Sequence, residues 1–210
     1  MSTWTRPKVK PIARLVLGLY LFGLGLAMMI HSGLGVAPWD VLGQGLQNQT
    51  GWSFGVTTVI VSAVVLLLWI PIRQKPGLGT LVNAVSIGPF ADLSRPLMPE
   101  TTGFWANLAL MLLGLVVVAM GSGLYLSAGL GGGPRDGLMV GLTRVTGIPF
   151  WIVRTIGESL VLVIGWLLGG TVGLGTALFA FGIGYLAQIS MKIFGFNPKK
   201  DHLKQQGHND

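Results

Sequence analysis

The sequence predicts an all-α fold, a polytopic membrane helical bundle of six transmembrane helices built as two inverted three-helix repeats. Three observations predict it. Apolar residues far outnumber charged ones, one glycine-rich motif occurs twice, and basic residues gather in alternate loops. Each repeat is also expected to hold one short helix, broken or re-entrant, beside its three spans.

The composition excludes an ordinary soluble domain. Of the 210 residues, 51% are hydrophobic and 10% charged, whereas soluble domains carry about 25% charged residues. The mean hydropathy is +0.68. Long apolar runs occupy residues 15–30, 56–72, 108–126 and 156–168. Since about 20 apolar residues span a bilayer, these runs predict helices that cross the lipid bilayer.

A duplicated motif divides the chain into two halves. The stretch GLGVAPWDVL begins at Gly33, and GLGGGPRDGL begins 96 positions later, at Gly129. The same offset carries GLGT at Gly77 onto GLGT at Gly173. Roughly a third of about 80 aligned residues are identical without a gap, which apolar composition alone does not explain. The chain is therefore predicted to be a tandem duplication.

Each half is expected to form the same series of helices. A long helix comes first, followed by a glycine-rich break, a short helix and two more long helices. In the first half these helices are predicted at 14–31, 38–48, 54–72 and 78–94. In the second half they are predicted at 106–127, 134–145, 149–168 and 173–191. The short helices, about 16 Å long, cannot cross a hydrocarbon core of about 30 Å.

The charges predict the orientation of the spans. Three crossings per half invert the second half relative to the first, and the loops on one side then receive nearly all the basic residues. The other side receives only Arg95, beside Asp92 and Glu100. The positive-inside rule makes the basic side cytoplasmic, so both termini are predicted to be cytoplasmic.

The same reasoning divides the chain into five parts. These are a basic cytoplasmic N-terminus (1–13), membrane repeat 1 (14–98), an external linker (99–105), membrane repeat 2 (106–195) and a flexible cytoplasmic tail (196–210).

Equivalent positions in the two halves differ according to the side of the membrane that they are predicted to face. Trp39 is accordingly expected at the outer interface, and its equivalent Arg135 at the cytoplasmic one.

Both breaks place a proline and an aspartate where a short helix would begin. Proline fits the first helical turn, and the carboxylates of Asp40 and Asp136 complement the positive end of the helix. On one interpretation these aspartates only stabilise the helix ends. On the other they gate or bind a ligand, because transporters place sites where helices break near a repeat interface.

Arg154 and Glu158 are the candidate charged pair within the membrane. Glu158 lies about nine residues, or roughly 14 Å, into its helix, and the spacing of four puts both side chains on one face. A glutamate at that depth must be paired, protonated or in contact with water. The pair is thus either a neutralising contact or part of a substrate or proton site.

Other polar and small residues have packing interpretations. Asn83 is expected to bind ligand or to form an interhelical hydrogen bond. Small residues recur on the last helix of each half, and we expect these two helices to pack around a pseudo-twofold axis. The packing residues are Ala84, Gly88, Ala91, Gly173, Ala177, Ala180, Gly184 and Ala187.

The sequence holds no recognised catalytic motif. Nucleophile elbows, Walker loops and zinc motifs are missing, and the chain has no cysteine. We therefore expect no enzyme activity, metal or cofactor. Basic residues without interleaved aromatics also argue against nucleic acid, while a homo-oligomer stays possible.

The doubled motif, the six predicted crossings and the basic tail resemble the bacterial YczE/YitT-like membrane proteins. The resemblance covers about residues 14–195, and GLGVAPWDVL with GLGGGPRDGL is its most specific part. It implies a location in the bacterial plasma membrane and supplies no substrate.

Two functions are compatible with these features. The first is a transporter or permease of a small solute, with a site between the inverted repeats. The second is a membrane scaffold or regulatory subunit that does not transport and that recruits a protein partner or anionic lipid.

Overall fold

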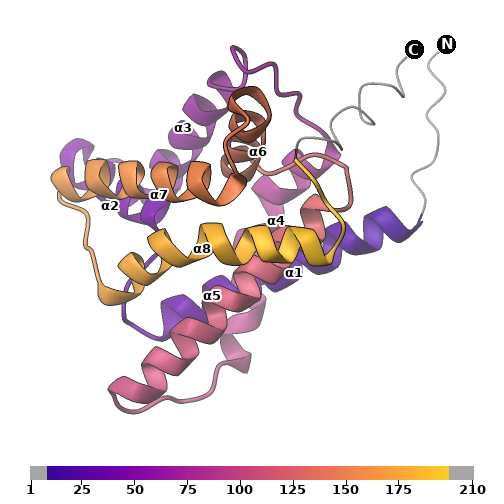
Figure 1. Cartoon of the computed structure of the whole chain (residues 1–210). Helices are drawn as coiled ribbons and strands as arrows, with labels where there is room; N and C mark the ends of the chain where they lie inside the picture. Colours follow the sequence, from indigo (N-terminus) through magenta and orange to yellow (C-terminus); the bar gives the residue numbers. More distant parts are fainter. Residues whose placement is uncertain (1–8, 199–210) are drawn as a thin grey trace, which may run out of the picture.

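Eight α-helices and one 3₁₀ helix make up the regular structure of residues 9–198, the part of the chain that the computed structural model describes (Figure 1). The first half contains α1 (Val9–His31), α2 (Pro38–Thr50), α3 (Phe54–Leu67), α4 (Leu78–Ser94) and the 3₁₀ helix η1 (Arg95–Leu97). The second half contains α5 (Phe104–Leu126), α6 (Pro134–Thr146), α7 (Phe150–Leu167) and α8 (Leu174–Ile193). The all-α prediction is confirmed for these residues; most of the predicted termini, 1–13 and 196–210, lies outside them.

Four helices are long and apolar enough to cross a membrane: α1, α5, α7 and α8. The pair α2 and α3 would add a fifth span if the two helices, bent by 117° relative to each other, formed one broken crossing. α3 has 14 residues and α4 has 17, or about 21 and 26 Å. The described residues therefore supply four to five candidate spans, where the sequence predicts six.

α3 ends at Leu67, although the apolar run predicts helix as far as Ile72. Pro71 explains the difference, because it has no N–H to donate to the Leu67 carbonyl oxygen and its ring obstructs that carbonyl. In the turn that follows α3, the Trp69 side chain points into the protein and is only 2% exposed. Its indole N–H donates a hydrogen bond to the Pro134 carbonyl oxygen at 3.1 Å. The turn after α3 therefore places Trp69 in contact with the other half of the chain.

α1 and α5 cross at the centre of the molecule through four glycines (Figure 1). Gly25 faces Gly114, where an added Cβ would lie 2.6 Å from the Gly114 carbonyl oxygen, and Gly18 faces Gly121. The two helices thus run antiparallel, with backbones in contact that any larger side chain would separate. The sequence predicts α4 and α8 around the axis; instead α4 packs on α1, and α8 packs on α5 and α7.

Each glycine-rich break is held by the other half of the chain. The Gly79 N–H donates to the Leu130 carbonyl oxygen at 2.7 Å, and the Gly175 N–H donates to the Leu34 carbonyl oxygen at 2.9 Å. These two contacts are equivalent in the duplication, since both donors and both acceptors are 96 positions apart. The start of one half's last helix thus satisfies a carbonyl that the other half's break leaves outside any helix.

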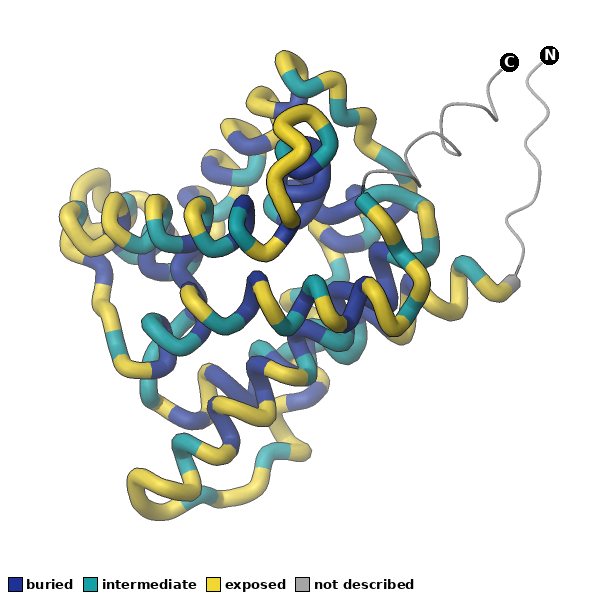
Figure 2. Tube along the Cα trace, in the orientation of Figure 1, coloured by how far each residue is buried: buried dark blue, intermediate teal, exposed yellow. Residues whose placement is uncertain are grey.

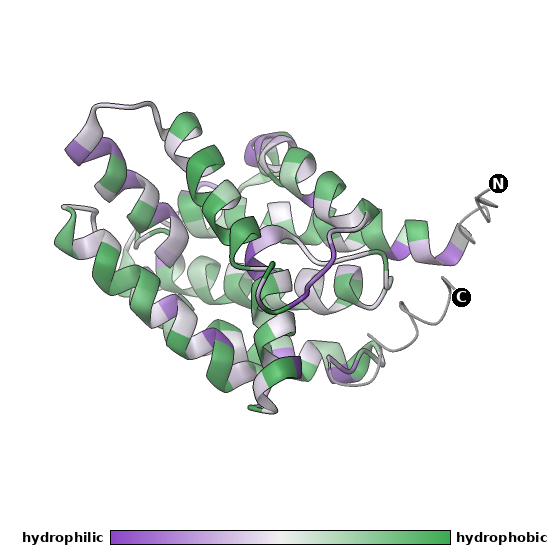
Figure 3. Ribbon diagram, turned by 90° about the horizontal axis from the view of Figure 1, so that it is seen from above, coloured by the Kyte–Doolittle hydropathy of each residue, from purple (hydrophilic) through white to green (hydrophobic). Residues whose placement is uncertain are grey.

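The sides of the long helices expose mainly apolar residues, whereas the three buried charged residues, Asp136, Arg154 and Glu158, lie inside. Exposed positions recur along the outer helices (Figure 2), and hydrophobic residues dominate the helical ribbon (Figure 3). α7 shows the pattern most clearly, because it exposes Ile156 and Leu160 while burying Arg154 and Glu158. Such a helix is unfavourable in water and suits lipid, where charged residues face the interior of the bundle.

Candidate functional site

One cavity of about 590 Å³ lies where the two breaks meet. Its walls come from both halves: α1, α3 and α4, the starts of α2 and α6, and side chains of α7 and α8. The structure brings every predicted substrate-binding or gating residue to this cavity, namely Asn83, Asp40, Arg135, Asp136, Arg154 and Glu158.

The short helices α2 and α6 begin at the cavity. Proline occupies the start of each helix, and Asp40 and Asp136 lie in the first turns, as the motif predicts. The N-cap residues themselves, Ala37 and Gly133, make no side-chain capping bond. The carboxylates of Asp40 and Asp136 differ in burial and in how closely an arginine approaches them.

Asp136 is buried and tightly held. Arg154 Nη1 lies 2.8 Å from its Oδ1 atom, and the Tyr125 hydroxyl donates a hydrogen bond to its Oδ2 atom. The same hydroxyl accepts the Gly133 N–H at 3.2 Å. Tyr125 therefore connects the break before α6 to the carboxylate in the first turn of that helix.

Asp40 is held more loosely, and by the other half of the chain. Arg135 Nη1 lies 3.7 Å from Asp40 Oδ1, with side chains 31% and 26% exposed respectively. The Arg135 guanidinium also covers the Trp39 ring, 5.2 Å from its centroid. The prediction that Trp39 and Arg135 lie at opposite membrane interfaces is wrong, because both belong to helix starts that meet at the cavity.

Glu158 is the third carboxylate of the cavity. Its Oε1 atom lies 3.7 Å from Arg154 Nε. The prediction that the two side chains lie on one face of α7 is therefore confirmed. Arg154 is nonetheless closer to Asp136 than to Glu158. Glu158 Oε2 is buried and makes no hydrogen bond to any described residue. Arg154 thus neutralises Asp136 first, and the Trp39 indole is the other side-chain donor close to the Glu158 carboxylate.

The chemistry of the cavity is asymmetric. The positions equivalent to Tyr125, Arg154 and Glu158 in the first half are Met29, Thr58 and Ser62. Asp40 therefore has no arginine or tyrosine from its own half that matches those of Asp136. Sequence reasoning missed Tyr125, although a tyrosine in the last turn of an apolar helix, where the other half has methionine, was an available signal.

Asn83 and the predicted packing residues divide between the cavity and helix contacts. Asn83 lies so close to Gly133 that a Cβ added to Gly133 would contact the Asn83 amide. Ala84 and Gly88 line the cavity.

The other predicted packing residues lie in contacts between helices. Ala91 lies beside Gly23 of α1, and Gly173 lies against the break at Leu34. Ala180 and Ala187 are fully buried on α8, whereas Ala177 is half-buried. Gly184 packs on α7.

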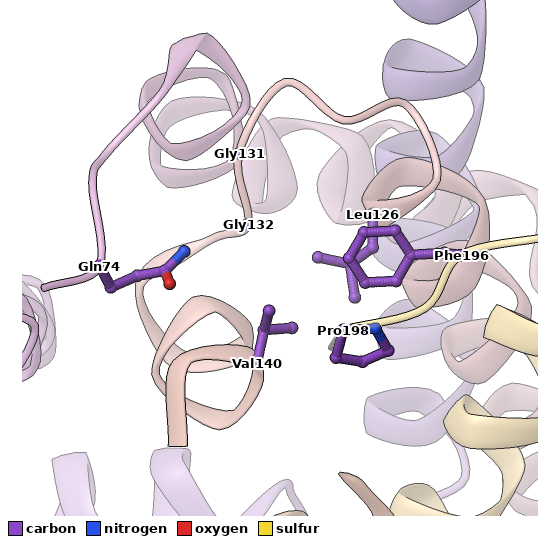
Figure 4. A pocket seen from close by; sticks show the side chains of 7 residues that line it. All are labelled: Gln74, Leu126, Gly131, Gly132, Val140, Phe196 and Pro198. Atoms are coloured by element: carbon purple, nitrogen blue, oxygen red, sulfur yellow. The ribbon is translucent and has the colours of Figure 1, made fainter. Parts of the chain in front are cut away.

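A much smaller cavity of about 20 Å³ lies behind the second break, room for about one water molecule. Figure 4 shows Phe196 and Pro198, which follow α8, directed toward Val140 and Leu126 beside Gly131–Gly132. The segment after α8 therefore covers this side of the break. Among residues 9–198, no three His, Cys, Asp or Glu side chains gather as a metal site.

The apolar exterior, the candidate spans and the enclosed charges define a multi-pass integral membrane protein. The chain belongs to a family of unknown function (DUF6198), whose model matches residues 9–192. The resemblance to YczE-like proteins predicted from the doubled motif is thereby confirmed.

Three relatives cover most of the chain. An uncharacterized protein of Haemophilus influenzae is 38% identical over 94% of this chain and 90% of its own length. The uncharacterized membrane protein YczE of Bacillus subtilis is 34% identical over 83% and 82%. The uncharacterized protein YyaS of the same organism is 29% identical over 84% and 90%. No solved structure matches the chain.

Proposed function

We propose that this protein is a transporter of a small solute in the bacterial plasma membrane, with its site in the cavity between two inverted repeats. The observation that carries the proposal is the cavity itself, which joins both breaks and holds five charged side chains. Charged groups inside a membrane bundle mark solute or ion pathways, and discontinuous helices at a repeat interface are typical of transporter sites.

In this proposal the six spans are α1, α3, α4, α5, α7 and α8. The apolar turns at 68–72 lengthen α3, and η1 extends α4. The short helices α2 and α6 enter from opposite sides and begin at the cavity. The antiparallel crossing of α1 and α5 supports this arrangement, because an inverted repeat places equivalent helices head to tail about its axis.

Contacts at the far ends of the short helices agree with the predicted sides. Arg144, near the end of α6, donates hydrogen bonds to the Ile72 carbonyl oxygen and to Gln74 Oε1. Asn48, near the end of α2, donates to the Gly169 carbonyl oxygen at 2.7 Å. The first contact joins segments predicted to be cytoplasmic, and the second joins segments predicted to be external.

The two halves differ in a way that supports alternating access. α7 and α8 pack directly, and an added Cβ at Gly184 would lie 2.6 Å from the Trp151 carbonyl oxygen. The equivalent Gly88 on α4 has open space at this position, and α3 and α4 line the cavity. We propose a second state in which α3 and α4 close while α7 and α8 separate, which would open the cavity to the other side.

Cross-linking tests the proposal, because the chain contains no cysteine. One variant carries cysteines at Trp151 and Gln188, which are joined here by a hydrogen bond from the Trp151 N–H. The second carries them at the equivalent positions Gly55 and Asp92. Treated in membranes with a short thiol cross-linker, both variants should cross-link, since each pair closes in one state.

A third variant, with cysteines at Trp52 and Ile148, serves as the control, because the proposal places these positions on opposite sides of the membrane. Cross-linking of the 151/188 pair alone would show a rigid protein and would contradict alternating access. Flux of a solute panel into proteoliposomes, blocked by cross-linking either pair, is the matching functional measurement.

A further inference from the structure

We infer that the cavity binds a zwitterion of the α-amino-acid type with an apolar side chain, whose two charges insert between Asp40 and Arg135. This inference rests on the proposed function, because it takes the cavity as the solute site. It adds the chemical class of the solute and the two residues that would recognise it.

The two ion pairs of the cavity differ in how open they are. Arg154 and Asp136 approach to 2.8 Å, and their side chains are 3% and 7% exposed. Arg135 and Asp40 are 3.7 Å apart and remain partly exposed, beyond the separation of about 2.7–2.9 Å of a charge-assisted hydrogen bond. The tight pair stabilises the second break, whereas the loose pair is available to a ligand.

Charge balance restricts what the loose pair accepts. A ligand with a single charge would pair with Asp40 or Arg135 and leave the other group desolvated without a partner, which is costly in a low-dielectric site. A ligand that carries a carboxylate and an ammonium group satisfies both residues and leaves the total charge unchanged. One loose contact is thereby replaced by two charge-assisted hydrogen bonds.

The other walls describe the rest of the ligand. They are mainly apolar and include three aromatic rings, those of Phe22, Trp39 and Phe179, beside Leu26, Val59, Leu66 and Ile87. The cavity volume of about 590 Å³ lies within the range of about 300–1,000 Å³ that is usual for small-molecule sites. An aromatic or branched aliphatic side chain beside the two charges matches this lining.

Glu158 suggests a competing ligand, a simple organic cation. Its Oε2 atom makes no hydrogen bond to a described residue, although the Trp39 indole is close by, and it is an acceptor in the same cavity. A cation would need no carboxylate, so matched compounds separate the two cases. Phenylalanine carries both charges, phenethylamine lacks the carboxylate, and 3-phenylpropanoate lacks the ammonium group.

The experiment measures thermal unfolding of the purified full-length protein in detergent with each compound, because a ligand of the folded state raises the unfolding temperature. Phenylalanine should raise it in a saturable manner, and the two single-charge analogues should not. Equal stabilisation by phenethylamine or 3-phenylpropanoate would overturn the inference. So would the lack of any shift with phenylalanine at concentrations that saturate weak sites.

Variants then assign the site. Asp40→Asn should weaken phenylalanine binding about ten- to a hundredfold, the effect of losing one hydrogen bond to a charged group, and Asp40→Glu should restore part of it. Asp92→Asn is the matched control, since its 3.6 Å ion pair with Arg95 is exposed. Unchanged binding in a folded Asp40→Asn variant would overturn the assignment.

Binding in detergent is independent of transport. Selective phenylalanine binding without flux would refute the proposed transport function and leave the ligand class standing. Flux of another solute without phenylalanine binding would refute the ligand class and leave the proposed transport function standing.

Discussion

Arg135 Nη1 lies 3.7 Å from Asp40 Oδ1, so the second break supplies the cation that faces the aspartate of the first. An aspartate lies in the first turn of both short helices. Only the second half, however, has an arginine on its next helix, Arg154. Asp40 is therefore paired across the repeat interface, and this pair joins the two halves at the cavity.

Replacing Arg154 should be among the most damaging single changes in the cavity. The Arg154→Gln variant leaves Asp136 and Glu158 buried without their cation, and loss of one partner of a buried pair costs about 3–5 kcal/mol. Thermal unfolding in detergent measures the loss. Arg95→Gln, which removes an exposed arginine from its ion pair with Asp92, should unfold like the wild type. If the Arg154→Gln protein is as stable as that control, the buried ion pair between Arg154 and Asp136 does not stabilise the fold as described.

Tyr125→Phe tests the hydroxyl that joins the second break to Asp136. The change removes a hydrogen bond to the carboxylate and the acceptor of the Gly133 N–H, and we expect a loss of about 1–3 kcal/mol. Tyr185→Phe provides the comparison, because Tyr185 is 59% exposed. Equal unfolding temperatures for the two variants would show that the hydroxyl does not stabilise the break.

Gly25→Ala tests the close crossing of α1 and α5. Its Cβ would lie 2.6 Å from the Gly114 carbonyl oxygen, and such overpacking costs about 1–3 kcal/mol. Gly55→Ala adds the same methyl group where nothing lies within 4 Å, so its stability should match or exceed that of the wild type. If thermal unfolding ranks the two variants in the opposite order, α1 and α5 do not meet as described.

Glu158→Gln should preserve the fold and alter solute binding or movement. The substitution keeps the shape of the side chain and removes a charge whose Oε2 atom makes no hydrogen bond to a described residue. Stability near wild type together with changed proteoliposome flux is the expected result. Glu100→Gln, in the loop before α5 and outside the cavity lining, is the control. A Glu158→Gln protein with wild-type flux of a transported solute would remove Glu158 from the site.

Periodicity and the repeat were sufficient to locate the eight α-helices, and the motif identified Asp40, Arg135 and Asp136 among the residues that line the cavity. The break residues were recognisable because proline and aspartate have strong positional preferences at helix starts. Arg154 and Glu158 were recognisable because charges are costly within an apolar span. These signals are local, so a single sequence carries them.

Contacts between separate helices were not predictable in the same way. The inward turn of Trp69, the bond from Tyr125 to Asp136 and the meeting of Arg135 with Asp40 all join residues from different elements. The positive-inside rule describes loops, and it misplaced Trp39 and Arg135 because their helices begin within the protein. The small-residue pattern likewise favoured α4 and α8, although the glycines of α1 and α5 permit the closer approach.

Labelling at two equivalent positions tests the inverted architecture most directly. Trp52 and Ile148 lie 96 positions apart, just beyond the ends of the short helices, with exposures of 49% and 40%. In intact cells, a membrane-impermeant maleimide should react with Trp52→Cys and should reach Ile148→Cys only after the membrane is permeabilised. Reaction at both positions before permeabilisation, or at neither, would contradict a protein made of two oppositely oriented halves.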